Sequence, residues 1–427
     1  MRRISEDTPK VLIVAPNASS VFGGESFLPL QYFRLLRKRG YPVKLVTHAR
    51  NRHDLEAYLG SDLAAVSFVE DTAAHRAVWR FGSRFPGLIR EVIFGTALAS
   101  LDALFLSIII RRLVREGHVD VIHQPTPVSP LAPSGLHRFK VPLIIGPMNG
   151  GMNYPPGYDD LEGPRARHFV AWSRRLAWLI NRAMPGKRDA AVLLVANERT
   201  RASLPFSSHP DVRVLVENGV DLATWQVGHF QKQPAKLPSH VQGSLRLIFM
   251  GRLVPWKMVN LTLEAIQLSL RQGANVTLDV LGDGPERAHL EQLVKDQSLE
   301  RNVRFHGYLP QAACAEVVAD ADALILNSVR ECGGAVILEA MALGLPVIAT
   351  DWGGPADYLD ESCGMLISPV PRESFVERLG AAILQLSWQP DLRRRMGEAG
   401  TRKIVDQYDW EKKIDMIVSI YAEVASV

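Results

Sequence analysis

The feature that most constrains the fold of this chain is a repeated series of short apolar runs, each bounded by turn residues or by a helical pattern. In the first half of the chain these runs are Val11–Ala15, Val43–Thr47, Val119–His123, Val141–Ile145, Ala191–Ala196 and Val212–Val216. In the second half they are Leu245–Met250, Val276–Leu281, Val303–His306, Ala323–Leu326 and Pro346–Ala349. Such runs are typical of parallel strands buried on both faces. The pattern predicts an α/β chain with two doubly wound parallel sheets.

The length of the chain and the spacing of its turn residues indicate two domains. A chain of 427 residues is too long for one core of usual size, and two domains of about 200 residues are the expectation. Residues 226–244 contain glycines and prolines among polar residues, which is typical of a linker. We therefore expect an N-terminal domain at 1–225 and a C-terminal domain at 245–409.

A glycine pair precedes a predicted helix in the second half of the chain. Good helix formers run over Ala335–Leu343, directly after Gly333 and Gly334. The glycines let the backbone approach a ligand closely, and the free amides of Ala335 and Val336 favour an anion at the start of the helix. This junction is therefore a candidate phosphate site.

Two glutamates flank the candidate phosphate site. Glu331 precedes the helix, and Glu339 lies about one turn into it, roughly 6 Å deeper at about 1.5 Å per residue. Carboxylates on either side of a phosphate can accept hydrogen bonds from two sets of hydroxyls, one on a sugar and one on a ribose. Taken alone, the spacing also fits ordinary surface glutamates on a solvated helix.

Two cations after another predicted strand strengthen the first interpretation. Arg252 and Lys257 follow the run Leu245–Met250 and precede a helical pattern over Met258–Leu270. A planar guanidinium and a mobile ammonium at this spacing can converge on one diphosphate. Either pair of charges alone fits a solvated surface, but together they predict a sugar-diphosphate site.

These motifs resemble those of the retaining glycosyltransferases of the group 1 or family 4 type, which include sucrose synthases and mannosyltransferases. The matching segments are Asn218–Asp221, Gly251–Leu253 with Lys257, Gly282–Pro285, Phe305 with Gly307, Glu331–Ala342, Gly344–Ala349, Gly353–Pro355 and the weaker Gly23–Glu25. The resemblance implies the GT-B architecture, in which two Rossmann-like domains face each other across a cleft. It also implies that a closing helix at 410–427 returns to the first domain.

The resemblance assigns donor-binding roles to the candidate residues. Glu331 orients the hydroxyls of the transferred sugar, Glu339 holds the ribose, and the base lies near Tyr308 and Leu309. In the first domain, Gly23 and Gly24 open a helix whose amides approach the donor phosphates or the sugar.

The resemblance also implies a mechanism. Arg252, Lys257 and the amides of Ala335 and Val336 stabilise the charge that grows on the leaving diphosphate. The acceptor hydroxyl attacks from the face that the phosphate leaves, so that the configuration is retained without a protein nucleophile. Hexose transfer is implied, and neither a metal nor a cofactor is required.

Two positions depart from the family pattern. A histidine often lies close to the transferred sugar, and His123 is the candidate, but Pro125 stands where a second histidine is usual. His123 therefore fits either an active-site residue or a strand-end histidine that is satisfied by the backbone. Met258 stands where the family has glycine after the lysine, which puts the placement of Lys257 in question.

The charge is divided unevenly along the chain, and one segment concentrates it. Residues 1–244 carry a net charge of +11 and residues 245–427 a net of −7, which together give the +4 of the whole chain. Residues 165–188 hold seven arginines and lysines and no acidic residue, interleaved with aromatic residues at helical spacing. The pattern fits a basic amphipathic helix that rests on an anionic membrane surface, and equally a helix packed on its own domain.

Other features favour a peripheral protein of the cytoplasm, on the inner face of the cell membrane. The run Val92–Ile110 is almost long enough to span a membrane, but Asp102 within it favours a buried or interfacial helix. The segment 1–10 lacks the apolar run of a signal peptide. Cysteines at 314, 332 and 363 have no paired spacing, which indicates a reducing compartment.

The function that we expect is transfer of a sugar from a nucleotide-diphosphate sugar to a hydroxyl of a glycan or lipid-linked acceptor, in polysaccharide or glycolipid synthesis. The alternative is a catalytically weak homologue that binds sugar nucleotides as a partner subunit. Asp320-Ala321-Asp322 imitates a metal-binding motif, but its position predicts a helix terminus. A dinucleotide fingerprint and nucleic-acid-reading motifs are both missing from the sequence.

Overall fold

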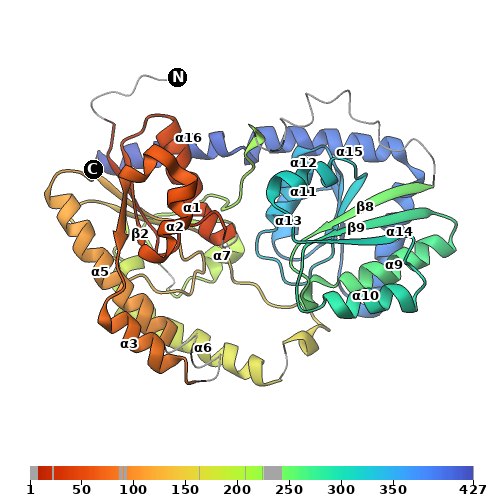
Figure 1. The fold of residues 1–427 in the computed structure, drawn as a ribbon, viewed down its shortest axis with the longest axis horizontal. Helices are drawn as coiled ribbons and strands as arrows, with labels where there is room; N and C mark the ends of the chain where they lie inside the picture. The colour runs from red at the N-terminus through yellow and green to blue at the C-terminus, as the bar shows by residue number, and fades with distance from the viewer. Residues whose placement is uncertain are drawn as a thin grey trace. The chain divides into compact units, whose positions relative to one another are not determined.

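The computed structural model describes residues 8–21, 24–85, 90, 94–162, 164–206, 208–223, 225 and 243–426. The chain divides into two compact units. Unit 1 comprises 1–151, 165–217 and 413–427, and unit 2 comprises 152–164 and 218–412. Each unit contains one parallel sheet with its own helices, which confirms the predicted α/β class (Figure 1).

Unit 1 is built on a seven-stranded parallel sheet with the order β3-β2-β1-β4-β5-β6-β7. Its strands are β1 (Val11–Val14), β2 (Val43–His48), β3 (Val66–Val69), β4 (Val121–Gln124), β5 (Leu143–Met148), β6 (Val192–Val195) and β7 (Val212–Val214). All residues of β1, β4, β5 and β6 are buried, because helices cover the central strands on both faces. The chain order reverses between β1 and β4, as in doubly wound folds.

Three helices of unit 1 carry residues of the pocket around Asp102 or of the basic segment 165–188. They are α3 (Ala73–Gly82), α5 (Gly95–Arg115) and α6 (Pro164–Ala183); the others are α1 (Gly24–Lys38), α2 (Arg52–Leu59), α7 (Glu198–Ala202) and most of α16 (Trp410–Ala425). Asp102, near the middle of α5, is buried. Among the described residues no helix is both long enough and apolar enough to cross a membrane.

The last helix, α16, joins unit 1, as the sequence predicts. Arg39 and Arg213 pair with Asp415 and Glu423 of this helix at 2.7 and 2.6 Å. The buried Lys413 ammonium donates to the carbonyl oxygen of Glu217 at 2.7 Å. These contacts bring the C-terminal residues to the sheet of unit 1.

Unit 2 is built on a six-stranded parallel sheet with the order β10-β9-β8-β11-β12-β13. Its strands are β8 (Ser244–Met250), β9 (Asn275–Leu281), β10 (Val303–Gly307), β11 (Ala323–Leu326), β12 (Val347–Thr350) and β13 (Gly364–Ile367). Its helices are α9 (Val259–Arg271), α10 (Arg287–Asp296), α11 (Gln311–Val318), α12 (Ala335–Ala342), α13 (Gly354–Tyr358), α14 (Phe375–Trp388) and α15 (Pro390–Lys403). The chain order again reverses beside the first strand, between β8 and β11.

The observed division of the chain differs from the predicted domains at three places. The segment 152–164 belongs to unit 2, because Trp352 donates to the carbonyl oxygen of Asn153 and Arg372 pairs with Asp160. Unit 2 also begins at residue 218 and extends to 412, beyond the predicted 409. Of the predicted linker 226–244, Ser244 already lies in β8, and 226–242 lie outside the described residues.

Candidate functional site

The turn after β8 carries both predicted cations of unit 2. Lys257 ends a short 3-10 turn, Pro255–Lys257, and Met258 forms the N-cap of α9. Met258 has φ 52° and ψ 35°, the left-handed conformation that glycine adopts with the least strain. Methionine therefore preserves the backbone path expected of glycine, and its side chain is 3% exposed in the core.

The loop after β11 is tied to this turn by hydrogen bonds from a short polar sequence. The Asn327 amide donates to the carbonyl oxygen of Met258 at 2.8 Å and accepts from the Thr262 hydroxyl at 2.8 Å. The backbone amide of Val329 donates to the carbonyl oxygen of Trp256 at 2.9 Å. These bonds fix the segment that contains Lys257 against the segment that leads to Glu331.

Lys257 and Glu331 form an ion pair, although 74 residues separate them in sequence. Their side chains are 14% and 17% exposed, so solvent screens the pair less than a surface pair. Arg252 is exposed on the same turn, and the described part of the chain offers it no carboxylate partner. The structure thus brings one predicted cation, Lys257, to one predicted glutamate at the carboxyl ends of β8 and β11, with Arg252 on the same turn as Lys257.

Helix α12 begins beside this ion pair with free amide groups. Its N-cap, Gly334, has φ 87°, and no side chain caps the helix. Ala335 and Val336 are the first two residues of the helix, as predicted, and both are half-buried. A helix N-terminus of this kind attracts an anion through its amides and its dipole.

The loop that carries Glu331 is held by close backbone packing. The Gly354 amide donates to the carbonyl oxygen of Glu331 at 2.7 Å. A β-carbon at Gly354 would lie 2.2 Å from the carbonyl oxygen of Gly333, well inside van der Waals contact. Glycine is therefore required at this position, which explains one of the recognised motifs.

A second glycine motif supports the turn that carries Arg252. The amide of Leu253 donates to the carbonyl oxygen of Asp283 at 3.0 Å. A β-carbon at Gly282 or Gly284 would lie 2.0 Å from the Gly251 oxygen or 2.2 Å from the Leu253 oxygen. The Gly-Asp-Gly sequence after β9 is thus a backbone support, in agreement with the rejection of a dinucleotide fingerprint.

Cys314 interacts with one residue predicted to lie near the base and with one predicted to hold the ribose. The Cys314 thiol donates to the carbonyl oxygen of Leu309 at 3.4 Å. Burial raises the pKa of Cys314, and the charge of Glu339 on α12 raises it further. Tyr308 is highly exposed after β10. Leu309 and Glu339 therefore both lie near Cys314.

His123 occupies a different environment from that of a substrate-contacting histidine. It is fully buried in β4, where Nδ1 lies 2.6 Å from the Tyr421 hydroxyl and Nε2 lies 2.7 Å from the carbonyl oxygen of Gly146. Desolvation lowers the pKa of His123 to about 4, against the opposing effect of the Gly146 hydrogen bond. Both ring nitrogens have protein partners, which favours the alternative of a histidine satisfied within the fold.

Three further sequence predictions have separate outcomes. Gly24 begins α1 in unit 1 and is exposed, whereas Gly23 lies outside the described residues. Asp322 accepts a hydrogen bond from the backbone amide of Arg246 at 2.8 Å and is buried between α11 and β11. The Asp320-Ala321-Asp322 sequence therefore follows a helix end, as predicted.

Sequence reasoning missed the polar residues that position the ion pair. Asn327 and Ser328 are fully buried, and the Ser328 hydroxyl donates to the carbonyl oxygen of Trp256 at 3.2 Å. The available signal was the abrupt change from Ala-Leu-Ile-Leu to Asn-Ser at the end of a buried strand. A polar pair at such a strand end must find hydrogen-bond partners when it is buried.

Comparison with known proteins places the C-terminal half in a described family. Residues 232–403 match the family described as Glycosyl transferases group 1. The glycogen synthase of Mycobacterium tuberculosis is 27% identical over 208 residues, which cover 48% of this chain and 47% of that protein. The chain thus spans about half the length of that curated relative.

Two further similarities extend over nearly the whole chain. The D-inositol 3-phosphate glycosyltransferase of Geodermatophilus obscurus is 26% identical over 417 residues, covering 94% of this chain and 85% of that protein. The crystal structure of Anabaena Alr3699/HepE in complex with UDP covers 97% of this chain and 100% of that one, with a TM-score of 0.65 and 17% identity. At this identity the structural likeness demonstrates the shared GT-B fold.

Proposed function

We propose that this chain, whose residues 232–403 match the family described as Glycosyl transferases group 1, transfers a hexose from a nucleotide-diphosphate sugar to a hydroxyl of a glycan or lipid-linked acceptor. The observation that carries this proposal is the Lys257–Glu331 ion pair beside the uncapped start of α12. An ammonium, a carboxylate and free amides at one place match a phosphate and an adjacent sugar hydroxyl.

The diphosphate of the donor binds between the cations and the helix. Arg252 and Lys257 contact its oxygens, while the amides of Ala335 and Val336 donate hydrogen bonds to the leaving phosphate and stabilise the charge that develops on it. Lys257 and the helix amides are held in place before the donor arrives, so their electrostatic stabilisation costs little reorganisation in the transition state. Glu331 serves the sugar hydroxyls and at the same time orients Lys257.

The nucleoside lies on the other side of this helix start. Glu339 accepts hydrogen bonds from the ribose hydroxyls, and the base contacts the backbone near Tyr308 and Leu309. The proximity of Leu309 and Glu339 to Cys314 supports this assignment.

Transfer proceeds with retention of the anomeric configuration. The acceptor oxygen forms a bond to the anomeric carbon as the bond from that carbon to the diphosphate oxygen breaks. The acceptor proton passes to the departing phosphate, so no protein nucleophile takes part. We propose that neither a metal nor a cofactor is needed, since cationic side chains and amides supply the positive charge.

The chain also acts at an anionic membrane surface in the cytoplasm. The α6 helix bears exposed Trp178 and Leu179, 47% and 55% exposed, among the exposed Arg174, Arg175 and Arg182. Large apolar side chains on a basic helix are costly in water and favourable at the headgroup level of an anionic bilayer. Lys187, counted with this basic segment in the sequence, is instead buried and donates to the carbonyl oxygen of Pro130 at 2.6 Å.

A donor screen followed by a transfer assay tests the proposed function. Thermal-shift measurements across nucleotide-diphosphate sugars identify the donor as the compound that stabilises the chain through binding. Release of the labelled sugar to water or to an acceptor then measures turnover. Turnover that is lost in Lys257→Ala and in Glu331→Ala supports the proposal. Donor binding without turnover across the panel would favour the catalytically weak partner subunit instead.

A further inference from the structure

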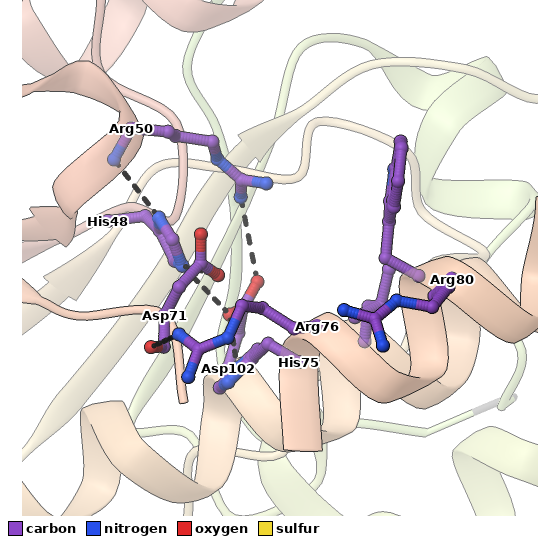
Figure 2. Close-up of a pocket in the computed structure, with 9 residues that line it drawn as sticks. His48, Arg50, Asp71, His75, Arg76, Arg80 and Asp102 are labelled. Atoms are coloured by element: carbon purple, nitrogen blue, oxygen red, sulfur yellow. Dashed lines mark hydrogen bonds and ion pairs between the residues drawn. The ribbon is translucent and has the colours of Figure 1, made fainter. Parts of the chain in front are cut away.

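A second group of charged residues lies in unit 1, whereas Lys257 and Glu331 of the proposed donor site belong to unit 2. A pocket of about 420 Å³ is lined by His48 at the end of β2, by α3 residues His75, Arg76 and Arg80, and by Arg50 and Asp102 (Figure 2). The side chains of His48, His75 and Asp102 are buried, although the charged ends of Arg76 and Arg80 belong to exposed residues. The pocket therefore has a buried polar floor and an exposed cationic rim.

The carboxylates of this pocket lie close to histidine nitrogens and to one guanidinium. Asp102 Oδ1 lies 3.1 Å from His75 Nε2 and 3.8 Å from His48 Nε2, and its Oδ2 lies 3.6 Å from the Arg50 guanidinium. Asp71, at the pocket wall, lies 3.3 Å from His48 Nε2. In the described part of the chain Arg76 and Arg80 have no carboxylate partner, so the charge that remains uncompensated is positive.

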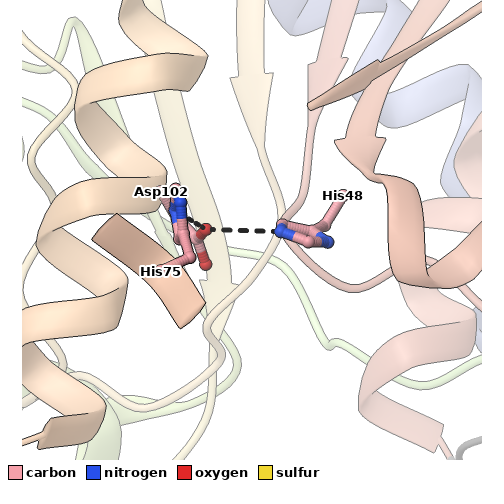
Figure 3. A group of neighbouring side chains, drawn as sticks. All are labelled: His48, His75 and Asp102. Carbon is pink, nitrogen blue, oxygen red and sulfur yellow. Dashed lines mark ion pairs between the residues drawn. The ribbon is translucent and has the colours of Figure 1, made fainter. Parts of the chain in front are cut away.

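The hydrogen bonds of the two histidines argue against a metal ion at His48, His75 and Asp102, which lie close enough together to hold one (Figure 3). The backbone amide of Arg50 donates to Nδ1 of His48 at 3.2 Å, and that of Thr72 donates to Nδ1 of His75 at 3.3 Å. Each neutral ring must then carry its proton on Nε2. A metal would need the lone pair of that same nitrogen, with Nδ1 donating to an acceptor.

The surrounding arginines point to the same conclusion. Arg50, Arg76 and Arg80 line the pocket, and Figure 2 shows their guanidinium groups around it. A divalent cation beside three guanidinium groups is repelled, whereas an anion gains planar, multiple hydrogen bonds. The Arg50 guanidinium faces Asp102 from one side, and the remaining arginines of the rim are left to an anionic ligand.

The pocket adjoins a larger cavity of about 740 Å³, and the two share Arg50, Leu98 and Asp102 in their walls. The larger cavity extends to Pro16 after β1 and to Thr126 after β4. These are the carboxyl ends of the strands between which the chain order reverses, where doubly wound sheets bind ligands. A ligand in the larger cavity can thus extend an anionic group into the arginine pocket.

We propose that the arginine pocket of unit 1 binds the phosphate ester of a phosphorylated acceptor, with Arg50, Arg76 and Arg80 as its cationic contacts. This inference rests on the proposed transferase function, because it names the chemical class of the acceptor. Trp79 also lines the pocket and is 67% exposed, so its ring supplies an apolar wall for the carbon skeleton beside the phosphate. The phosphate can belong to a soluble sugar phosphate or to a lipid headgroup.

The binding test uses calorimetric titration of the full chain with inorganic phosphate and a hexose 6-phosphate, with the unphosphorylated hexose as reference. Lys257→Gln serves as the background, because it weakens phosphate binding at the proposed donor site. The added double variant Arg76→Gln with Arg80→Gln is expected to raise Kd at least about tenfold, since it removes charge-assisted hydrogen bonds. Arg84→Gln is the matched control, because this exposed arginine follows α3 but does not line the pocket.

A vesicle arm separates the two sources of phosphate. Vesicles of phosphatidylcholine with and without phosphatidylinositol are sedimented with the same variants. If the chain binds the hexose 6-phosphate and the double variant does not, the phosphate belongs to a soluble acceptor. Binding that requires phosphatidylinositol, and that the double variant but not Arg84→Gln loses, assigns a lipid source.

Other outcomes would contradict the phosphate pocket and leave the proposed transferase function unaffected. One is that the double variant and the control have equal Kd values and equal vesicle binding. Another is tight binding of Zn²⁺ that His75→Gln abolishes, in a chain that binds no phosphate. Conversely, if no donor supports transfer, loss of phosphate binding in the double variant still supports the pocket, and the transferase proposal fails separately.

Discussion

The Lys257 ammonium and the Glu331 carboxylate contact each other across the turn after β8 and the loop after β11. The same two residues are the ones that the sequence assigns to the diphosphate and to the transferred sugar. Because each orients the other, the proposed site depends on the pair as a unit. Loss of either member leaves the remaining charge partly shielded from water and without its partner.

Substitution at this pair is expected to be strongly non-additive. Lys257→Ala and Glu331→Ala should each lower kcat roughly a hundredfold to a thousandfold, the range for removal of one electrostatic contact to a leaving group. The double variant should be little worse than either single variant, because the residues act together. The measurement is kcat with the identified donor, and Arg394→Ala with Glu398→Ala, an exposed helix pair on α15, is the control. Independent, additive losses at 257 and 331 would contradict the coupling.

The left-handed backbone of Met258 predicts an unusual order of stability. Met258→Ala and Met258→Gly both remove the buried side chain, so both should destabilise unit 2. The glycine variant should nevertheless be the more stable by about 1 kcal/mol, because it adopts φ 52° without steric strain. Midpoints of urea unfolding measure the difference. At an ordinary helical position an alanine variant is more stable than a glycine variant. If Met258→Ala is more stable than Met258→Gly, the backbone at this position is not strained.

The buried His123 predicts a loss of stability in acid. Its folded pKa of about 4 lies below its unfolded value, so between those values the unfolded chain binds a proton that the folded chain does not. Stability therefore falls as the pH drops through this window, by about 2 kcal/mol between pH 7.5 and pH 5 from this residue alone. The loss of unfolding free energy over that range should be smaller in His123→Gln.

The protonation state of His123 can also be measured directly, which tests the prediction even if His123→Gln does not fold. The ring nitrogens of His123 can be followed by NMR in the wild-type chain, where we expect a neutral ring at pH 5. A ring that is fully protonated at pH 5 would contradict the burial and the hydrogen bonds to Tyr421 and Gly146.

Membrane association is expected to depend on the exposed apolar residues of α6. Trp178→Ala with Leu179→Ala should weaken binding to anionic vesicles by roughly tenfold or more, from the loss of buried apolar area. Raising the salt concentration should weaken the remaining binding by screening the arginines. Vesicle sedimentation measures both effects. Trp388→Ala, an equally exposed tryptophan of unit 2, should leave binding unchanged, and an equal loss in that variant would point to non-specific adsorption.

Turnover is expected to survive the removal of divalent metals. The chain supplies positive charge at the proposed site through Arg252, Lys257 and the start of α12, while Asp322 is occupied with the backbone amide of Arg246. Addition of EDTA should therefore leave kcat unchanged, and Asp320→Asn should do the same. A sharp loss with EDTA that Mg²⁺ or Mn²⁺ restores would show that a metal takes part.

Local patterns predicted the central strands, the helix starts and one edge strand of each sheet, β7 and β10, but missed the other edge strand of each. Strands β3 and β13, at opposite ends of the two sheets, were not recognised. Three of the four residues of β3 are only half-buried, and β13 begins at Gly364, so neither has the fully apolar pattern of a central strand. An edge strand has one neighbour fewer, and its composition is correspondingly less constrained.

The sequence by itself determined the two doubly wound sheets, the resemblance to the group 1 glycosyl transferases and the glycine positions around the proposed donor site, because buried parallel strands and tight turns impose strong local requirements. Only the tertiary structure decided which distant side chains meet. In the folded chain Lys257 pairs with Glu331, and His123 contacts Tyr421 and Gly146. His48, His75 and Asp102, which come from three separate elements, lie close together. Such contacts depend on the order of strands in a sheet and on the packing of helices against it, which no local pattern of residues records.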